Sequence, residues 1–357
     1  AEIVHGVVNE LHGAANKNNG DTFLLIWRCK KWDADSEDED SEEDRPKDKP
    51  KAAVAVQSES LRPRRRLTDG IWKDEHFAPT KLADMAVLAF AKIIGAVHSS
   101  PVLADYRGHP GLQHKLGSNY RVEIKCGLHF GWAIEGAVGS EYKIDASYLS
   151  PNVAVTIGME EATKYYSVCF LATQAVVSLC SLGMASKCRL IDRVLVPGSK
   201  DALELYSIDL DTSFVRLENK GRVRIMWSSK ARMRARQRLE ADKSANKFED
   251  MPELFEQDPN IMAMRRSCTE QFQENFRMGY QNYAQGEWQV ARRFLEQTHQ
   301  LHNDGPSWFL IRFMESWQFE APPDWQGIHV LGPASNLSWA GTSYAPTSGE
   351  RQGYHAL

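Results

Sequence analysis

Residues 122–139 read VEIKCGLHFGWAIEGAVG, and this stretch decides the fold. Residues 120–126 alternate between polar and apolar side chains, as a strand with one buried face does. Four glycines follow between Gly127 and Gly139, which suits a tight passage from one strand to the next. We expect His129, alone between these glycines, to be a packed core residue. Acid–base catalysis or ligand binding by a histidine needs partner side chains, and the sequence does not identify any.

The regions on both sides alternate between helical and strand patterns. Apolar residues at helical spacing predict helices at residues 2–11, 82–97, 150–165 and 174–182, of which the second is amphipathic. A turn is expected at residues 16–21, and strands are expected at residues 22–27, 168–171, 189–196 and 203–208. Such alternation through about two hundred residues predicts an α/β (α+β) domain.

The composition disfavours several classes of function. The net charge of −4 over 357 residues gives no general reason to expect nucleic-acid or membrane-surface binding. The six cysteines lie far apart, which favours reduced thiols and a cytoplasmic location. The uncharged residues 165–186 contain Ser, Thr and Gln, so we expect a buried strand and helix there and no membrane span. Because the chain begins at Ala1 without Met or a signal peptide, we expect a fragment of a longer protein, which leaves open a membrane anchor elsewhere in that protein.

Several segments depart from the globular pattern. Residues 33–75 form an insertion with nine acidic residues among residues 33–44 and a basic run at residues 62–66, and such charge density predicts disorder. Residues 213–262 are expected to be a basic linker. Its basic run at residues 222–247 contains Trp227 as its single aromatic side chain, which does not favour a nucleic-acid surface. In residues 263–330, aromatic and apolar side chains at helical spacing predict a small tail of two packed helices, similar to a tetratricopeptide unit. Residues 331–357 are expected to be a disordered end.

Two stretches resemble the catalytic domain of class III adenylyl and guanylyl cyclases. Residues 16–23, NKNNGDTF, are similar to the K/E-x-x-G-D turn that follows a helix and opens a strand in that family. Residues 122–139 are similar to the family's I-G-I-H-x-G-x-x-x-x-G-x-V-G segment. Met159 and Glu160 resemble the end of a helix that carries N-x-A-S-R-M-E in the family. The likeness covers residues 1–212 and implies a central, mostly antiparallel sheet flanked by helices, truncated at its N-terminal end.

The resemblance also implies roles for particular residues. A cyclase joins the ribose 3′-hydroxyl of a nucleoside triphosphate to the α-phosphate and expels pyrophosphate, with two metal ions held by carboxylates. Asp21 matches the second metal carboxylate, for Mg²⁺ or Mn²⁺, and the first would lie in a strand that precedes Ala1. Lys17 and Gly20 match the turn that selects the base, where Lys is the adenine-type residue, and Asp145 would accept a hydrogen bond from the adenine amino group. The structural alternatives are an ordinary turn aspartate and an exposed loop lysine.

The chain departs from the family at residues that stabilise the transition state. When the alignment is anchored on Met159, Ala154 stands at the family's Asn position and Gly158 stands at its Arg position. When it is anchored on Asn152, the Asn is kept and Thr156 stands at the Arg position. The Arg is absent in both registers, although a charged clamp on triphosphate oxygens cannot be replaced by neutral side chains.

The closing hairpin differs as well, because residues 196–198 read VPG where the family has a phosphate-binding Lys before Gly, and Lys200 is out of register. Loss of one such stabiliser typically slows the reaction about a hundredfold or more. The resemblance therefore implies the metal-supplying half of an adenylyl cyclase pair, which makes cyclic AMP from ATP with two metal ions at a site shared with a second cyclase domain. Two alternatives remain: a degenerate pseudo-cyclase that serves for dimerisation or scaffolding, and a module that binds a nucleotide without turnover.

Overall fold

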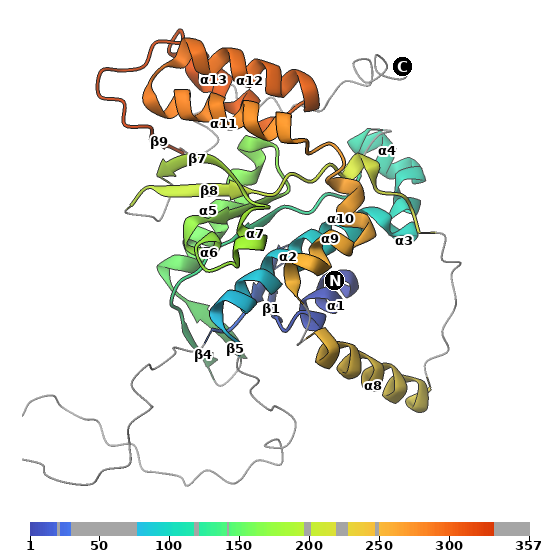
Figure 1. Cartoon of the computed structure of the whole chain (residues 1–357). Coiled ribbons are helices and arrows are strands. Elements are labelled where there is room, and N and C mark those ends of the chain that lie inside the picture. Colours follow the sequence, from blue (N-terminus) through green and yellow to red (C-terminus); the bar gives the residue numbers. More distant parts are fainter. Residues whose placement is uncertain are drawn as a thin grey trace, which may run out of the picture.

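The computed structural model describes residues 1–19, 22–29, 77–117, 121–140, 143–195, 201–218, 228–246 and 250–331. These residues form a mixed helix-and-sheet fold, as the sequence predicts (Figure 1). Five of the described strands make one sheet in the order β3-β6-β8-β7-β9. Two further antiparallel pairs, β1 with β2 and β4 with β5, lie beside it.

The central sheet is mixed, whereas the sequence predicted a mostly antiparallel one. Its strands are β3 (Cys126–Leu128), β6 (Phe170–Thr173), β7 (Arg189–Leu195), β8 (Leu203–Ser207) and β9 (His329–Val330). The pairs β3–β6 and β7–β9 are parallel, and the pairs β6–β8 and β7–β8 are antiparallel. Strands β3 and β6 run parallel because the connection between them crosses over through a long helix. The predicted hairpin of β7 and β8 is confirmed.

Two strand boundaries differ from the sequence prediction. Residues 121–125 have no regular structure, and β3 begins only at Cys126, where the backbone N–H donates to the Cys169 carbonyl at 2.8 Å. The alternation over residues 120–126 arises because Val122 and Ile124 pack on the core without a ladder partner. Near the N-terminus, the expected turn at residues 16–21 is largely strand, since β1 (Ala14–Asn19) pairs with β2 (Thr22–Ile26).

Helix α2 (Pro79–Ser99) forms the centre of one hydrophobic core. It was expected to be amphipathic, but Val87, Leu88 and Ile93 on different sides of it are all buried, because other helices surround it. These are α1 (Glu2–Glu10), α9 (Met251–Gln257) and α10 (Pro259–Met264). In the described part of the chain, α2 alone is long and apolar enough to cross a membrane, and 83% of its apolar window is buried inside the protein.

Helix α5 (Pro151–Tyr166) confirms the helix expected at residues 150–165. Its first turn is capped by Ser150, whose side-chain oxygen accepts from the Asn152 backbone N–H at 3.0 Å. The helix expected at residues 174–182 is instead two short ones, α6 (Gln174–Val177) and α7 (Leu182–Ala185). The break follows from buried Asp84 of α2, which accepts from the Ser181 backbone N–H at 2.9 Å and so fixes the start of α7.

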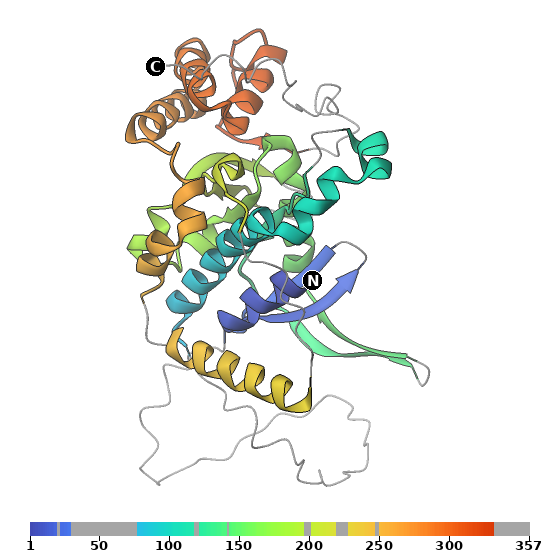
Figure 2. The same ribbon diagram turned by 90° about the vertical axis from the view of Figure 1, so that its right-hand side faces the viewer.

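The remaining short helices are α3 (Pro101–Asp105), η1 (Tyr106–Gly108), α4 (Pro110–Leu116) and η2 (Thr212–Phe214). The basic linker contains α8 (Ser229–Asn246), which lies beside α1 at the edge of the molecule farthest from the tail (Figure 2). Strands β4 (Ile134–Ser140) and β5 (Lys143–Leu149) form a long hairpin. The acidic insertion at residues 33–75 lies outside the described residues, as do residues 332–357.

The C-terminal tail packs directly on the central sheet. The two expected helices are confirmed as α11 (Glu270–Gln285) and α12 (Trp288–His302), separated at Gly286, whose φ of +86° is easy only for glycine. A third helix, α13 (Gly305–Ser316), follows them. The three helices cover β7, β8 and β9 in Figure 1 and share a buried core with α5 and the sheet. The likeness of this tail to a tetratricopeptide unit stays a prediction.

Candidate functional site

Strand β3 and helix α5 approach each other closely at Gly127. A Cβ atom at this position would lie 2.6 Å from the Glu160 backbone nitrogen and 2.7 Å from the Thr156 carbonyl oxygen. Both atoms belong to the backbone, so any larger residue would push the helix away from the sheet. The glycine pattern of the sequence therefore sets how closely α5 packs, and it brings the residues after β3 to the first turn of α5.

His129 has partners that the sequence did not reveal. Its Nδ1 lies 2.9 Å from the Thr173 hydroxyl at the end of β6, and its Nε2 lies 3.1 Å from Asn152 Oδ1 in the first turn of α5. In a neutral ring protonated on Nε2, Nε2 donates to Asn152 and Nδ1 accepts from Thr173. Burial lowers the pKa of His129, and the hydrogen bond to Asn152 opposes that shift. The expectation of a core residue without partners is thus corrected: His129 is half-buried and bonded at both ring nitrogens.

Asn152 is the centre of this cluster. Its side-chain amide donates to the Trp132 carbonyl at 2.9 Å, and the Ser150 hydroxyl donates to the same carbonyl at 2.6 Å. A Cβ atom at Gly131 would overlap the Asn152 amide, so glycine is needed where the loop passes over it. Asn152 therefore fastens the loop between β3 and β4 to the start of α5.

In the register anchored on Met159, the positions that match the family's Asn and Arg carry no polar side chain. Ala154 is exposed on α5, and Gly158 is half-buried one turn farther along the same helix. In the other register, Asn152 bonds to His129, and the Thr156 hydroxyl donates to the Asn152 backbone carbonyl at 2.8 Å. In either register, the positions of α5 that match the family's Asn and Arg offer no cation to a triphosphate.

The strands that carry Lys17 and Asp145 lie side by side, although the two residues are far apart in sequence. Lys17 is exposed on β1, opposite Leu24 of β2. Asp145 lies on β5, opposite Val138 of β4. The Asn16 side chain, next to Lys17, donates to the Ala146 carbonyl, next to Asp145, at 3.4 Å. Figure 2 shows the two hairpins side by side. Lys17 stands on a strand, not in the loop that the alternative interpretation assumed.

Other predicted residues lie outside the described part of the chain. They are Gly20, Asp21, residues 196–198 and Lys200. Within the described residues, no group of three or more His, Cys, Asp and Glu side chains is arranged to hold a metal ion. The assignment of Asp21 as a metal ligand therefore stays a prediction.

A buried charge cluster between the sheet and the tail was not predicted. Arg189, at the start of β7, donates to Asp209 Oδ1 at 2.5 Å and to Asp304 Oδ1 at 2.7 Å. The guanidinium carbon lies 4.0 Å from the centre of the Phe276 ring on α11. Although burial disfavours the charged guanidinium, the two carboxylates hold the pKa of Arg189 above its ordinary value.

A second buried polar group lies nearby. The Tyr166 hydroxyl donates to Asp192 Oδ2 at 2.6 Å, and His329 Nδ1 lies 3.4 Å from the same oxygen. Burial raises the pKa of Asp192 and lowers that of His329. A local signal existed only for Asp304, because an Asp three residues before Ser307 predicts a helix N-cap. Nothing local marks Arg189 or Asp192 as buried.

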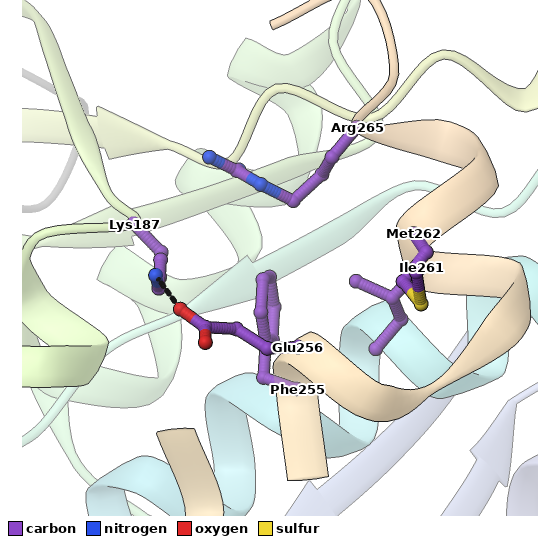
Figure 3. Close-up of a pocket in the computed structure, with 6 residues that line it drawn as sticks. All are labelled: Lys187, Phe255, Glu256, Ile261, Met262 and Arg265. Carbon is purple, nitrogen blue, oxygen red and sulfur yellow. Dashed lines mark hydrogen bonds and ion pairs between the residues drawn. The ribbon is translucent and has the colours of Figure 1, made fainter. Parts of the chain in front are cut away.

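A small cavity of about 210 Å³ lies between α9, α10 and the start of β7 (Figure 3). Its six lining residues are Lys187, Phe255, Glu256, Ile261, Met262 and Arg265. Lys187 forms an ion pair with Glu256 across it. None of the residues predicted from the sequence to bind nucleotide or metal lines this cavity.

Comparison with known proteins points to adenylate cyclases. No model of a known protein family matches the chain. A stretch of 89 residues, 25% of this chain, is 33% identical to an adenylate cyclase of Anabaena cylindrica and covers 18% of that protein. Two solved structures of a bacterial light-regulated adenylyl cyclase align with 68% of this chain at 15% and 16% identity, with TM-scores of 0.33 and 0.34. The chain covers 48% and 47% of those structures. Sequence similarity to an adenylate cyclase thus extends over a quarter of the chain.

Proposed function

We propose that this chain supplies the metal-binding half of an adenylyl cyclase pair, which converts ATP to cyclic AMP and pyrophosphate. The observation that carries the proposal is the 33% identity to an adenylate cyclase over 89 residues. The activity is proposed for an assembled pair, because the chain spans only 18% of that relative and lacks the family's cationic residues on α5.

The arrangement of β1 and β5 supports recognition of the base. An exposed ammonium on Lys17 can donate to an acceptor nitrogen of adenine, and a carboxylate at Asp145 can accept from its amino group. These roles require the two strands to be neighbours, and the hydrogen bond between Asn16 and Ala146 joins them. Lys17 and Asp145 would thus select adenine, together with Gly20, which lies outside the described residues.

The surface beside Asn152 supports the need for a partner domain. Phe130, Trp132, Ile134 and Leu149 are each 44% or more exposed, and we call them the apolar patch. Ile134 pairs with Leu149 across the β4–β5 hairpin, and the Trp132 carbonyl accepts a hydrogen bond from Ser150, the residue after Leu149. Large exposed apolar patches mark interaction sites. A second cyclase domain seated here would bring its own Asn, Arg and Lys toward α5.

The metal ions enter this proposal only through Asp21. Its carboxylate would bind Mg²⁺ or Mn²⁺, and the ions would lower the cost of developing charge on the attacking and leaving oxygens. Asp21 lies outside the described residues, so no coordination geometry is assigned. The residues described by the structure would do the rest: Lys17 and Asp145 bind the base, while the partner's cations bind the triphosphate.

A pseudo-cyclase is the second candidate, and the state of Asn152 favours it. The amide of this residue is occupied by His129, Trp132 and Ser150, so it is a structural anchor more than a substrate ligand. In that case the apolar patch would serve dimerisation alone. A module that binds a nucleotide without turnover is the third candidate, and it would bind ATP tightly with no partner present.

The deciding experiment measures cyclic AMP made from ATP with Mg²⁺ or Mn²⁺. The chain is extended at its N-terminal end by the strand in which the resemblance places the first metal carboxylate. It is assayed alone and mixed with a cyclase domain that keeps the Asn, Arg and Lys but lacks its own metal carboxylates. We expect activity only in the mixture, and we expect Asp21→Ala to lower it about a hundredfold or more. The matched control, Asp324→Ala, removes an exposed carboxylate of the tail and leaves turnover unchanged.

Two results would decide against the proposal. Unchanged turnover in Asp21→Ala would remove the metal assignment. Stable complexes of the two domains without any cyclic AMP would favour the pseudo-cyclase. Calorimetric titration of the chain alone with ATP separates the third candidate, since only a nucleotide-binding module would bind tightly without a partner.

A further inference from the structure

Helix α8 carries a dense block of positive charge on an exposed surface. Its first ten residues contain five basic side chains and no acidic one: Lys230, Arg232, Arg234, Arg236 and Arg238. All five are exposed, and none forms an ion pair with another described residue. Figure 2 shows α8 beside α1 and away from the central sheet, so most of its surface faces outward. A helix that is polar on every side gains little from apolar burial, so contact with opposite charge stabilises it.

The side chains of α8 disfavour two kinds of anionic partner. The helix contains no Phe, Tyr or Trp on which single-stranded bases would stack. Helices that lie in a membrane surface have a continuous apolar face, whereas Met233 and Leu239 are isolated among charges here. An acidic polypeptide needs neither feature, because carboxylates along an extended chain pair directly with lysine and arginine.

The same chain contains an acidic segment of matching size. Residues 33–44, which we call the acidic block, hold nine Asp and Glu residues and no basic one. The described chain resumes at Phe77, whose ring centre lies 4.5 Å from that of His12. His12 Nε2 is in turn 3.1 Å from the backbone carbonyl of Lys243, near the end of α8. The return point of the intervening segment is therefore beside α8.

The reach of the chain permits contact along the whole helix. Helix α8 has 18 residues and is about 27 Å long at 1.5 Å per residue. The 33 residues from the end of the acidic block to Phe77 can span up to about 110 Å at roughly 3.3 Å each. An extended twelve-residue block covers about 40 Å, so its carboxylates can follow the row of basic side chains.

We propose that α8 is the docking surface for the acidic block of its own chain. Five exposed cations face nine anions, and the tether through Phe77 raises the effective concentration of the block far above that of a free acidic protein. Each exposed pair contributes little alone, so the contact depends on several pairs together and on low salt. The proposal is independent of cyclase activity, because it concerns only the charges of residues 33–44 and α8.

A zero-length carbodiimide cross-link on the full chain tests the contact. The reagent joins a carboxylate to a lysine amine that touches it, and mass spectrometry identifies the joined residues. We expect Lys230 to be linked to the acidic block about fivefold or more above Lys115, an exposed lysine of α4. The link should disappear when ionic strength rises from about 0.1 M to about 1 M, because the screening length falls from about 10 Å to about 3 Å.

Two charge-reversal variants separate a specific contact from general attraction. Arg234→Glu with Arg238→Glu should lower the Lys230 link about fivefold or more. Arg266→Glu with Arg293→Glu makes the same change in net charge at exposed sites outside α8 and should leave the link unchanged. Equal linking of Lys230 and Lys115, or insensitivity to the α8 reversal, would overturn the proposal. Binding of the unmodified chain to phosphatidylserine vesicles, lost on the α8 reversal, would instead assign the helix to a membrane surface and also overturn it.

Discussion

Asp304, which caps helix α13, accepts a hydrogen bond of 2.7 Å from Arg189 of strand β7, 115 residues earlier in the chain. Asp304 also accepts from the Ser307 backbone N–H at 2.9 Å, so one carboxylate both starts the helix and holds it to the sheet. The side chains of Arg189 and Asp304 are 8% and 6% exposed, which shields this pair from water and salt. The tail is therefore joined to the sheet by a buried ion pair as well as by apolar packing.

Replacement of this carboxylate should destabilise the whole protein. Asp304→Asn keeps the helix cap, because an amide oxygen also accepts from Ser307, but it leaves Arg189 with Asp209 alone. We expect a loss of about 3 kcal/mol in the free energy of unfolding, the low end of the range for breaking a buried pair, since one carboxylate remains. Urea unfolding measures it, with Asp324→Asn as an exposed control. Equal stability of the two variants would show that the ion pair contributes nothing.

The same residue predicts how stability changes in acid. Burial opposes ionisation of Asp304, but Arg189 outweighs it and holds the pKa of this carboxyl below its ordinary value of 3.8. The unfolded chain therefore takes up the proton first, and the stabilisation is present above pH 3.8 and is lost as pH falls through the lower folded pKa. The stability of Asp304→Asn should therefore not show this part of the decrease in acid. Urea unfolding midpoints of both proteins, measured at several pH values below 4, test this prediction. Midpoints that fall in parallel with pH in the two proteins would contradict the assignment.

The packing of α5 on β3 predicts opposite effects for two glycine substitutions. Gly127→Ala places a methyl group against the backbone of Glu160 and Thr156, and such overpacking costs about 1–3 kcal/mol. Gly136→Ala in β4 meets nothing within 4 Å, so it should be neutral or stabilise slightly. Thermal unfolding of the two variants is the comparison. A Gly127→Ala protein as stable as the parent would mean that α5 does not pack this closely.

His129 should titrate below the ordinary histidine range. Burial lowers its pKa, so its ring proton signals in NMR should show a midpoint below the ordinary value of 6.5. Asn152→Ala removes the acceptor that favours the charged ring, so the midpoint should fall further. The exposed His114 of α4 serves as an internal reference in the same spectra. A midpoint that rises in Asn152→Ala would show that the amide mainly keeps water away.

Lys17 predicts the base preference of an assembled pair, if the proposed function holds. Lys17→Glu replaces a donor by an acceptor, which suits the N–H groups of guanine better than adenine. We expect kcat/KM for ATP to fall relative to that for GTP by about tenfold or more, the size expected for a mismatched hydrogen bond in a binding site. Asn18→Ala, on the next residue of β1, is the control. An unchanged ratio would return Lys17 to the class of exposed surface lysines.

Local patterns in the sequence determined several elements of this protein. Helix α5, the β7–β8 hairpin and helices α11 and α12 were predicted from periodicity, because each pattern is complete within one segment. The glycines of residues 122–139 were predicted to allow a tight passage from one strand to the next, and the structure shows that Gly127 allows the close approach of α5 to β3. The helical spacing of α2 was read as amphipathic, since a sequence window does not reveal how many neighbours surround a helix.

Only the tertiary structure decided which distant residues meet. His129 gained Thr173 and Asn152 as partners, and the strands of Lys17 and Asp145 became neighbours, through packing of segments that have no shared local pattern. The burial of Arg189 between Asp209 and Asp304 has the same origin. Hydrophobic periodicity specifies which face of an element is buried, but it contains little information about which other element covers that face. Contacts across 20 to 130 residues therefore depend on the shapes of the packed surfaces, which a single sequence records only indirectly.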